Sequence, residues 1–210
     1  MHTAALHRCL LACLALVSLG LASCATPLSK TECMAMDWRT IGYEDGAAGH
    51  PGSRISVHRR ACGEHGVAPD FDAYQAGRSE GLVEFCTAAN GYRIGVAGGE
   101  YADVCPVDRE DDFLRAFSEG RELYALRERV RSSDSQLGAR RRELERLEKA
   151  VTKNAAVAVD ETTTKEDRIA AVRDTAKLAE QIGKVKSEIG VLEKDLAHNR
   201  QELDAYLATQ

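Results

Sequence analysis

Apolar residues recur every seven positions through the C-terminal part of this chain, and few folds other than paired helices accommodate such a repeat. Residues 119–210 contain no proline and no cysteine, and they carry equal numbers of acidic and basic residues. Seven-residue spacing places apolar side chains on one helical face and is typical of coiled-coil pairing. The columns are Leu123, Val130, Leu137, Leu144 and Val151, then Ile182, Ile189, Leu196 and Leu203.

A short segment separates the two sets of columns. Residues 154–164 are rich in alanine, valine and threonine, which predicts a turn. Thr163 and Glu166 then have the spacing of a capping box for a second helix. Two helices of similar length joined by a short turn favour an antiparallel hairpin over residues 119–210. Parallel self-association through the same columns is the alternative.

The first 23 residues have the layout of a bacterial secretion signal. Arg8 is followed by an apolar run at residues 9–19 and then by small residues. The run is shorter than the roughly 20 residues that a membrane span needs. Residues 1–23 are therefore predicted to be a signal peptide.

The end of this segment, Leu21–Cys24, has the form of a lipobox. In that chemistry the thiol of Cys24 becomes a thioether to a diacylglycerol, and several acyl chains anchor the protein firmly. Ala25 follows instead of an aspartate. By the sorting rule of many Gram-negative bacteria, this predicts an outer-membrane lipoprotein whose domain faces the periplasm and whose anchor contacts the membrane.

Four cysteines remain after the expected cleavage and lipidation. An even number in an exported chain predicts two disulfides. Short helices expected over residues 34–48 and 54–65 would form an antiparallel pair that brings its cysteine-bearing ends together. The predicted bridges are Cys33–Cys62 and Cys86–Cys105.

A metal site is the competing interpretation of the same region. His58, Cys62 and His65 have the spacing of one helical face, and zinc accepts these ligand types. An oxidising compartment and the absence of a Cys-x-x-Cys pair favour the disulfides. No metal and no cofactor are therefore expected.

Residues 24–118 form the second predicted domain, rich in glycine and aromatic residues. A loose repeat of an acidic residue, an aromatic residue and glycines occurs at residues 37–46, 70–81 and 112–120. Asp37 and Asp70 are expected to cap helices, and the glycines to permit close helix packing.

A ligand groove is the alternative function of these aromatic residues. Its candidate residues are Trp38, Tyr43, Asp45, Asp70 and Tyr74, with Asp45 or Asp70 as the acid or base of an enzyme. The glycine-rich residues 91–101 lack the spacing of a phosphate-binding loop and are expected to form a turn-rich loop or a small hairpin.

A dense series of residues between Cys33 and about Tyr124 carries a family resemblance. It comprises Asp37, Trp38, Gly42, Asp45, Gly46, Gly49, His58, Cys62, Gly66, Val67, Pro69, Asp70, Tyr74, Gly77, Gly81, Leu82, Cys86, Gly91, Tyr92, Gly95, Gly98, Gly99, Tyr101, Cys105 and Pro106. In this order and spacing the stretch resembles a family of small bacterial envelope lipoproteins, catalogued as domain-of-unknown-function family 2799. The resemblance implies a location and a fold unit, and no activity, substrate or catalytic residue.

The sequence as a whole predicts a mainly α protein: a small disulfide-stapled, glycine-rich helical module followed by a long antiparallel helical hairpin. A net charge of −5 gives no general basic surface for nucleic acid. No catalytic motif is recognisable. The expected function is a non-catalytic scaffold or partner-binding role, through envelope proteins or self-association. The alternative is a cell-wall-acting enzyme or a ligand-binding protein that uses the groove.

Overall fold

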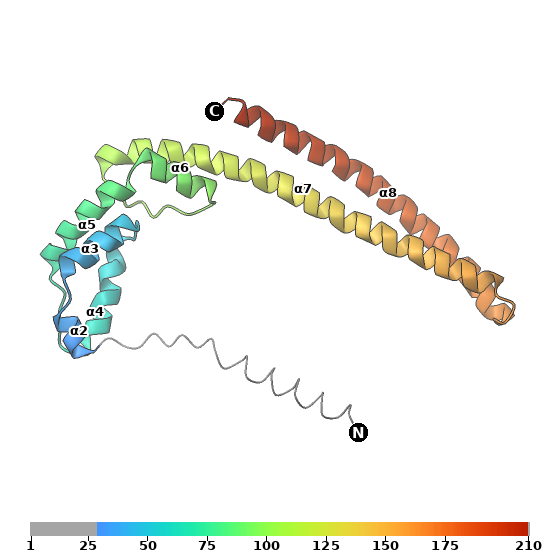
Figure 1. Cartoon of the computed structure of the whole chain (residues 1–210), viewed down its shortest axis with the longest axis horizontal. Coiled ribbons are helices and arrows are strands. Elements are labelled where there is room, and N and C mark those ends of the chain that lie inside the picture. Colours follow the sequence, from blue (N-terminus) through green and yellow to red (C-terminus); the bar gives the residue numbers. More distant parts are fainter. Residues whose placement is uncertain (1–28, 210) are drawn as a thin grey trace, which may run out of the picture. The chain divides into compact units, whose positions relative to one another are not determined.

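The computed structural model describes residues 29–209, which form helices joined by turns and contain no strand (Figure 1). The mainly α fold predicted from the sequence is confirmed. No helix in the described range is both long and apolar enough to cross a membrane. The predicted signal peptide, residues 1–23, and Cys24 lie outside the described residues. The helices are α2 (Lys30–Met34), α3 (Trp38–Ala47), the 3₁₀ helix η1 (Gly52–Arg54), α4 (Ile55–Gly63), α5 (Phe71–Phe85), α6 (Ala88–Val96), α7 (Val107–Val159) and α8 (Lys165–Leu207).

The chain divides into two compact units. The first unit ends at Gly81 and the second begins at Leu82, so helix α5 contributes residues to both. The border expected near residue 118 from composition lies within α7.

Both predicted disulfides are present, one in each unit. Cys33 and Cys62 are fully buried and their Cα atoms lie 5.5 Å apart. The Cα atoms of Cys86 and Cys105 lie 5.6 Å apart. Each bridge closes a short loop in a small helical unit, where constraint of the unfolded chain contributes about 2–4 kcal/mol.

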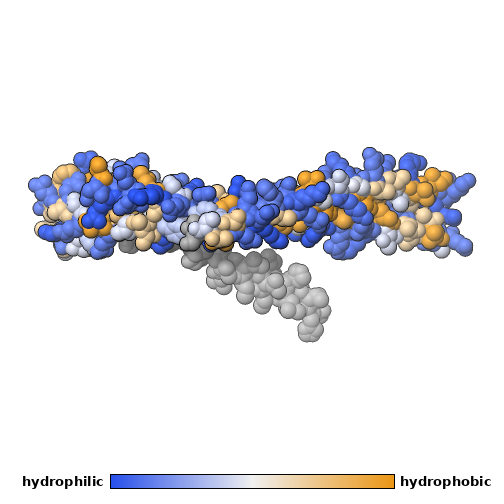
Figure 2. All heavy atoms as spheres, turned by 90° about the horizontal axis from the view of Figure 1, so that it is seen from above, coloured by the Kyte–Doolittle hydropathy of each residue, from blue (hydrophilic) through white to orange (hydrophobic). Residues whose placement is uncertain are grey.

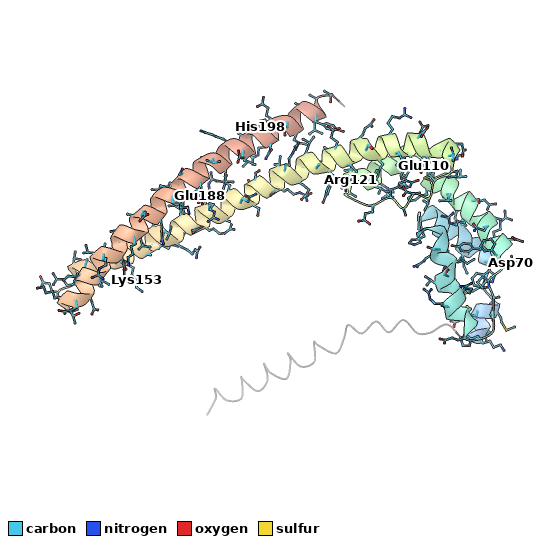
Figure 3. All side chains as sticks on the ribbon, turned by 180° about the vertical axis from the view of Figure 1, so that it is seen from behind. Asp70, Glu110, Arg121, Lys153, Glu188 and His198 are labelled. Atoms are coloured by element: carbon cyan, nitrogen blue, oxygen red, sulfur yellow. A yellow bond between two sulfur atoms is a disulfide. The ribbon has the colours of Figure 1, made fainter. Side chains whose placement is uncertain are left out.

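In the first unit, α3 and α5 begin at aspartate caps. The Asp37 carboxylate accepts a hydrogen bond from the backbone N–H of Arg39 at 3.0 Å. Asp70, labelled in Figure 3, accepts one from the N–H of Ala73 at 3.0 Å. Both residues thus satisfy backbone donors that a helix N-terminus leaves unpaired. The capping role expected for them is confirmed.

Glycines bring the backbones of α3 and α5 into contact. A Cβ atom on Gly42 would lie 2.0 Å from the carbonyl oxygen of Tyr74, and one on Gly77 would lie 1.8 Å from that of Arg39. These distances leave no room for any side chain. The expected close helix packing is confirmed. The contacts between the two helices offset the low helix propensity of glycine.

The second unit repeats this packing between α6 and the start of α7. A Cβ atom on Gly91 would lie 2.4 Å from the carbonyl oxygen of Phe113. The expected loop or hairpin at residues 91–101 is therefore wrong over its first part, which is helical. Thr87 caps α6 through the N–H of Asn90, and the glycines that suggested a turn serve instead for close backbone approach.

The hairpin consists of α7 and α8, which are joined by a turn at residues 160–164. The long helix begins at Val107, where the mostly acidic residues 108–111 suit a helix N-terminus, and so before the domain border expected at residue 119. It continues through Val159 into the segment predicted as a turn. The cap of α8 is Thr164, which accepts from the N–H of Asp167, one residue beyond the predicted capping box. The seam contains Leu123, Leu126 and Leu137 from α7, and Ala171, Val185 and Leu196 from α8.

Candidate functional site

The first unit encloses a polar cluster around the carboxylate of Asp45, a residue of α3 that is only 7% exposed. Its Oδ2 accepts a hydrogen bond from Tyr74 Oη at 2.8 Å and lies 2.8 Å from His58 Nε2. The guanidinium Nε of Arg54 lies 3.8 Å from Oδ1. Helices α3, α4 and α5 each supply one member, so the cluster is formed only when the unit folds.

Tyr74 is fully buried, and its environment keeps the phenol protonated. Burial raises the pKa of Tyr74, and the hydrogen bond to Asp45 raises it further. The positive charges of Arg78 and Arg54 act in the opposite direction and are outweighed. Tyr74 therefore donates to the carboxylate as a neutral group.

Two arginines border this cluster with incomplete hydrogen bonding. Arg78 Nη2 donates to the backbone oxygen of His50 at 3.0 Å. The Nε atoms of Arg54 and Arg78 are buried and have no hydrogen-bond partner. Buried donors of this kind are uncommon in folded proteins and call for an explanation.

The residues predicted to line a groove are mostly part of the core. Trp38 is 8% exposed, and its ring meets the edge of the His58 ring at a centroid distance of 6.5 Å. Trp38, Asp45 and Tyr74 are therefore brought together, but buried. The Asp70 carboxylate caps α5, and the backbone of half-buried Tyr43 lies against the glycines of α5.

The three residues considered for a metal site have other roles or partners. Cys62 is bonded to Cys33, and His58 Nε2 is bonded to Asp45. Within residues 29–209 no group of three potential ligands is placed to hold an ion. His58 was thus identified from its spacing, but its partner is a carboxylate.

The two units share one local architecture. Residues 42–49 read GYEDGAAG, and residues 91–98 read GYRIGVAG. The first glycine of each lies against a carbonyl of the next packed helix, Tyr74 for Gly42 and Phe113 for Gly91. Tyr74 and Phe113 are both fully buried, and they occupy equivalent positions.

The second helices of the two pairs also correspond. Each contains the sequence Ser-Glu-Gly, at residues 79–81 and 118–120. A Cβ atom on Gly81 would meet the carbonyl oxygen of Tyr43 at 2.1 Å, and one on Gly120 that of Tyr92 at 2.4 Å. In each pair a disulfide joins the segments that precede the two helices. The structure thus contains two copies of one motif, where the sequence suggested three loose repeats.

A second candidate surface lies at the tip of the hairpin, where orange apolar side chains gather in Figure 2. Val159 is 78% exposed, Ile169 51% and Val172 62%. A hollow of about 560 Å³ adjoins them. It is lined by Ala158, Lys165, Arg168, Ile169 and Val172.

The fold and these sites define a disulfide-stapled, two-repeat helical domain that continues into a helical hairpin. Residues 37–122 match the family described as "Protein of unknown function (DUF2799)". The predicted family resemblance is therefore confirmed for this part of the chain, and the match ends just after the second Ser-Glu-Gly. No curated protein and no solved structure gives a significant match to the chain.

Proposed function

We propose that this protein is a lipid-anchored, non-catalytic envelope protein that presents its helical hairpin to a partner protein. The anchor rests on the lipobox at Leu21–Cys24. The partner-binding role rests on one observation above all, the exposed apolar surface at the hairpin tip.

The apolar columns of the hairpin are used within the chain itself. Leu137 of α7 is 4% exposed and Leu196 of α8 is 6% exposed. Ion pairs flank this seam, including Arg141 with Glu193 at 2.8 Å. Self-association through the seam would require the hairpin to open, so the proposed partner surface lies elsewhere on the hairpin.

The tip offers a surface of that kind. Ile169 and Val172 lie on the first turns of α8 and are more than half exposed. Lys165 and Arg168 line the same hollow. A partner surface that combines apolar side chains with acidic groups would complement both features.

Site-specific photo-crosslinking in bacterial cells tests this proposal. A crosslinking amino acid at Ile169 should capture a defined partner, and Val172→Glu should remove that product. Val191 is the matched control, because it is also exposed, at 57%, on the same helix away from the tip. Equal crosslinks from positions 169 and 191, or none from either, would contradict the tip as the binding surface.

A ligand-binding role for the first unit is the second candidate function. It is favoured by the polar cluster around Asp45 and not by an open aromatic groove, because Trp38 and Tyr74 are buried.

A further inference from the structure

The two repeats differ most at four equivalent core positions. In the first repeat these positions hold a carboxylate, an imidazole, a phenol and a guanidinium. In the second they hold one aliphatic and three aromatic side chains. The equivalent pairs are Asp45 and Ile94, His58 and Tyr101, Tyr74 and Phe113, and Arg78 and Phe117.

The alignment rests on both spacing and contacts. Asp45 and Ile94 are each the third residue after the first glycine of the shared motif. His58 and Tyr101 each precede the second cysteine of their repeat by four residues. Each ring also lies against the buried aromatic residue of its own repeat. The centroid distances are 6.2 Å for His58–Tyr74 and 4.7 Å for Tyr101–Phe113.

In the second repeat the four side chains form an apolar core. The rings of Phe113 and Phe117 stack at 6.2 Å, and Tyr101 lies 6.3 Å from Phe117. Ile94 packs against the same cluster. The Tyr101 hydroxyl donates to Glu110, labelled in Figure 3, at 3.0 Å. The motif therefore folds without a buried charge at any of these positions.

The four polar side chains of the first repeat cost more free energy to bury than the four side chains of the second. Burying a carboxylate and the Nε–H groups of two arginines loses part of their hydration, and replacing buried ion pairs by apolar groups is often neutral or stabilising. Because the second repeat demonstrates an apolar solution for the same motif, the fold alone does not account for the polar cluster.

The charges of the cluster are unbalanced as well. Asp45 faces the guanidinium of Arg54 at 3.8 Å and the His58 ring at 2.8 Å. Arg78 acts on the same Tyr74 hydroxyl as Arg54 does. Arg54 and the His58 ring thus lie against the single carboxylate, and Arg78 adds a second permanent positive charge near the hydroxyl from which that carboxylate accepts. Both guanidinium groups retain an Nε–H without a hydrogen bond.

Arg54 belongs to a segment that the second repeat lacks. The chain from Gly49 to Cys62 is six residues longer than the chain from Gly98 to Cys105. The Arg54 side chain is 42% exposed although its Nε is buried, and the His58 side chain is 20% exposed. Arg54 and His58 therefore connect the buried cluster to the surface.

We propose that Arg54, His58 and Arg78 form a binding site for an oxyanion group, a carboxylate or a phosphate of a ligand. Arginine pairs with both groups through charge-assisted hydrogen bonds. Asp45 and Tyr74 act as positioning residues that hold the imidazole and Arg54 at the edge of the site. The bound anion supplies the negative charge that Asp45 alone does not provide.

The test is a titration of the full chain, with both disulfides formed, by inorganic phosphate and separately by acetate at constant ionic strength. The His58 imidazole resonances report binding. We expect the shifts to saturate as the anion concentration rises. Arg54→Gln should weaken the affinity at least about tenfold, because one charged hydrogen bond is lost. If only phosphate saturates the site, the ligand carries a phosphoryl group. If acetate saturates it, the ligand carries a carboxylate. Either result supports the site.

Two further variants separate binding from folding. Arg59→Gln removes an exposed charge on α4, next to His58 in the chain, and should leave the affinity unchanged. The variant Asp45→Ile, His58→Tyr, Tyr74→Phe, Arg78→Phe copies the second repeat and should remain helical while losing the thermal stabilisation that the binding anion gives the parent chain. The proposal is overturned if neither anion gives a saturable shift in the parent chain. Equal weakening by Arg54→Gln and Arg59→Gln would also overturn it, since it would show an adventitious ion only.

Discussion

Among single residues, Tyr74 has the most constrained environment. Its side chain is fully buried and its hydroxyl donates to a carboxylate that is itself buried. Removal of the hydroxyl leaves Asp45, which is only 7% exposed, with one donor fewer. The phenylalanine at the equivalent position of the second repeat shows that the ring alone suits the motif.

We expect Tyr74→Phe to lower the free energy of unfolding by about 1–3 kcal/mol near neutral pH, because a buried acceptor loses its partner. The variant should also change the response to alkali. Because burial raises the pKa of Tyr74, this residue's contribution is fully present below the unfolded pKa of about 10 and is lost as pH rises toward the folded value. Urea unfolding at about pH 8 and about pH 11 should therefore show a smaller alkaline loss in Tyr74→Phe than in the parent chain. An equal loss in both proteins would contradict this assignment.

The residues that carry the site could be predicted only in part. The aromatic and acidic residues near the glycines indicated Trp38, Asp45 and Tyr74, and helical spacing indicated His58. Arg54 and Arg78 gave no local signal, since arginines in a charged chain are usually solvated. Comparison of GYEDGAAG with GYRIGVAG would have identified the repeat, and through it the positions where polar residues replace apolar ones.

Among the helices, glycine has two different environments. In the packed helices of both repeats, glycines lie where a neighbouring backbone leaves no space for a side chain. In α8 the space beside Gly183 and Gly190 is open: apart from the adjoining backbone of α8, no atom would lie within 4 Å of a Cβ at either position. The first kind of glycine is required by packing, whereas the second only weakens the helix.

A methyl group should therefore have opposite effects in the two environments. Gly77→Ala places a Cβ 1.8 Å from the Arg39 carbonyl oxygen, and we expect a loss of at least about 2 kcal/mol. Gly183→Ala should instead gain about 0.5–1 kcal/mol through helix propensity. Thermal unfolding followed by circular dichroism measures both. Destabilisation by Gly183→Ala would indicate a close neighbour that the single chain does not contain.

The hairpin was the easiest element to predict, because a seven-residue column depends only on local spacing. Its limits were not predictable with the same accuracy. Alanine and valine at residues 155–159 suit a helix as well as a turn, and α7 extends through them. Helix α6 was missed because its glycines resemble a loop until the backbone of α7 lies beside them.

In the whole molecule, the family match and the repeats end together. Residues 37–122 contain the packed parts of both helix pairs, and the described chain after residue 122 is hairpin. The hairpin is thus an extension of the last helix of the second repeat. The predicted anchor lies at the other end of the chain, before the first repeat.

We expect Cys24→Ser to abolish labelling by a radioactive fatty acid and to release the protein from the membrane fraction. The reason is that the thioether requires the Cys24 sulfur, and no helix within residues 29–209 is able to span a bilayer. Cys33→Ser serves as a control, because its sulfur is committed to a disulfide. Persistent acylation of the Cys24→Ser protein would contradict the anchor.

Helix α7 has a mechanical consequence, because its 53 residues form one uninterrupted rod of about 80 Å. Its first turns are clamped against α6, beside the Cys86–Cys105 bridge, and its far end reaches the hairpin tip. A load applied at the tip is not absorbed by any hinge within α7. The load is transmitted along the helix to the contact between α6 and α7 at the glycines, so the packing of the second repeat has to resist the bending.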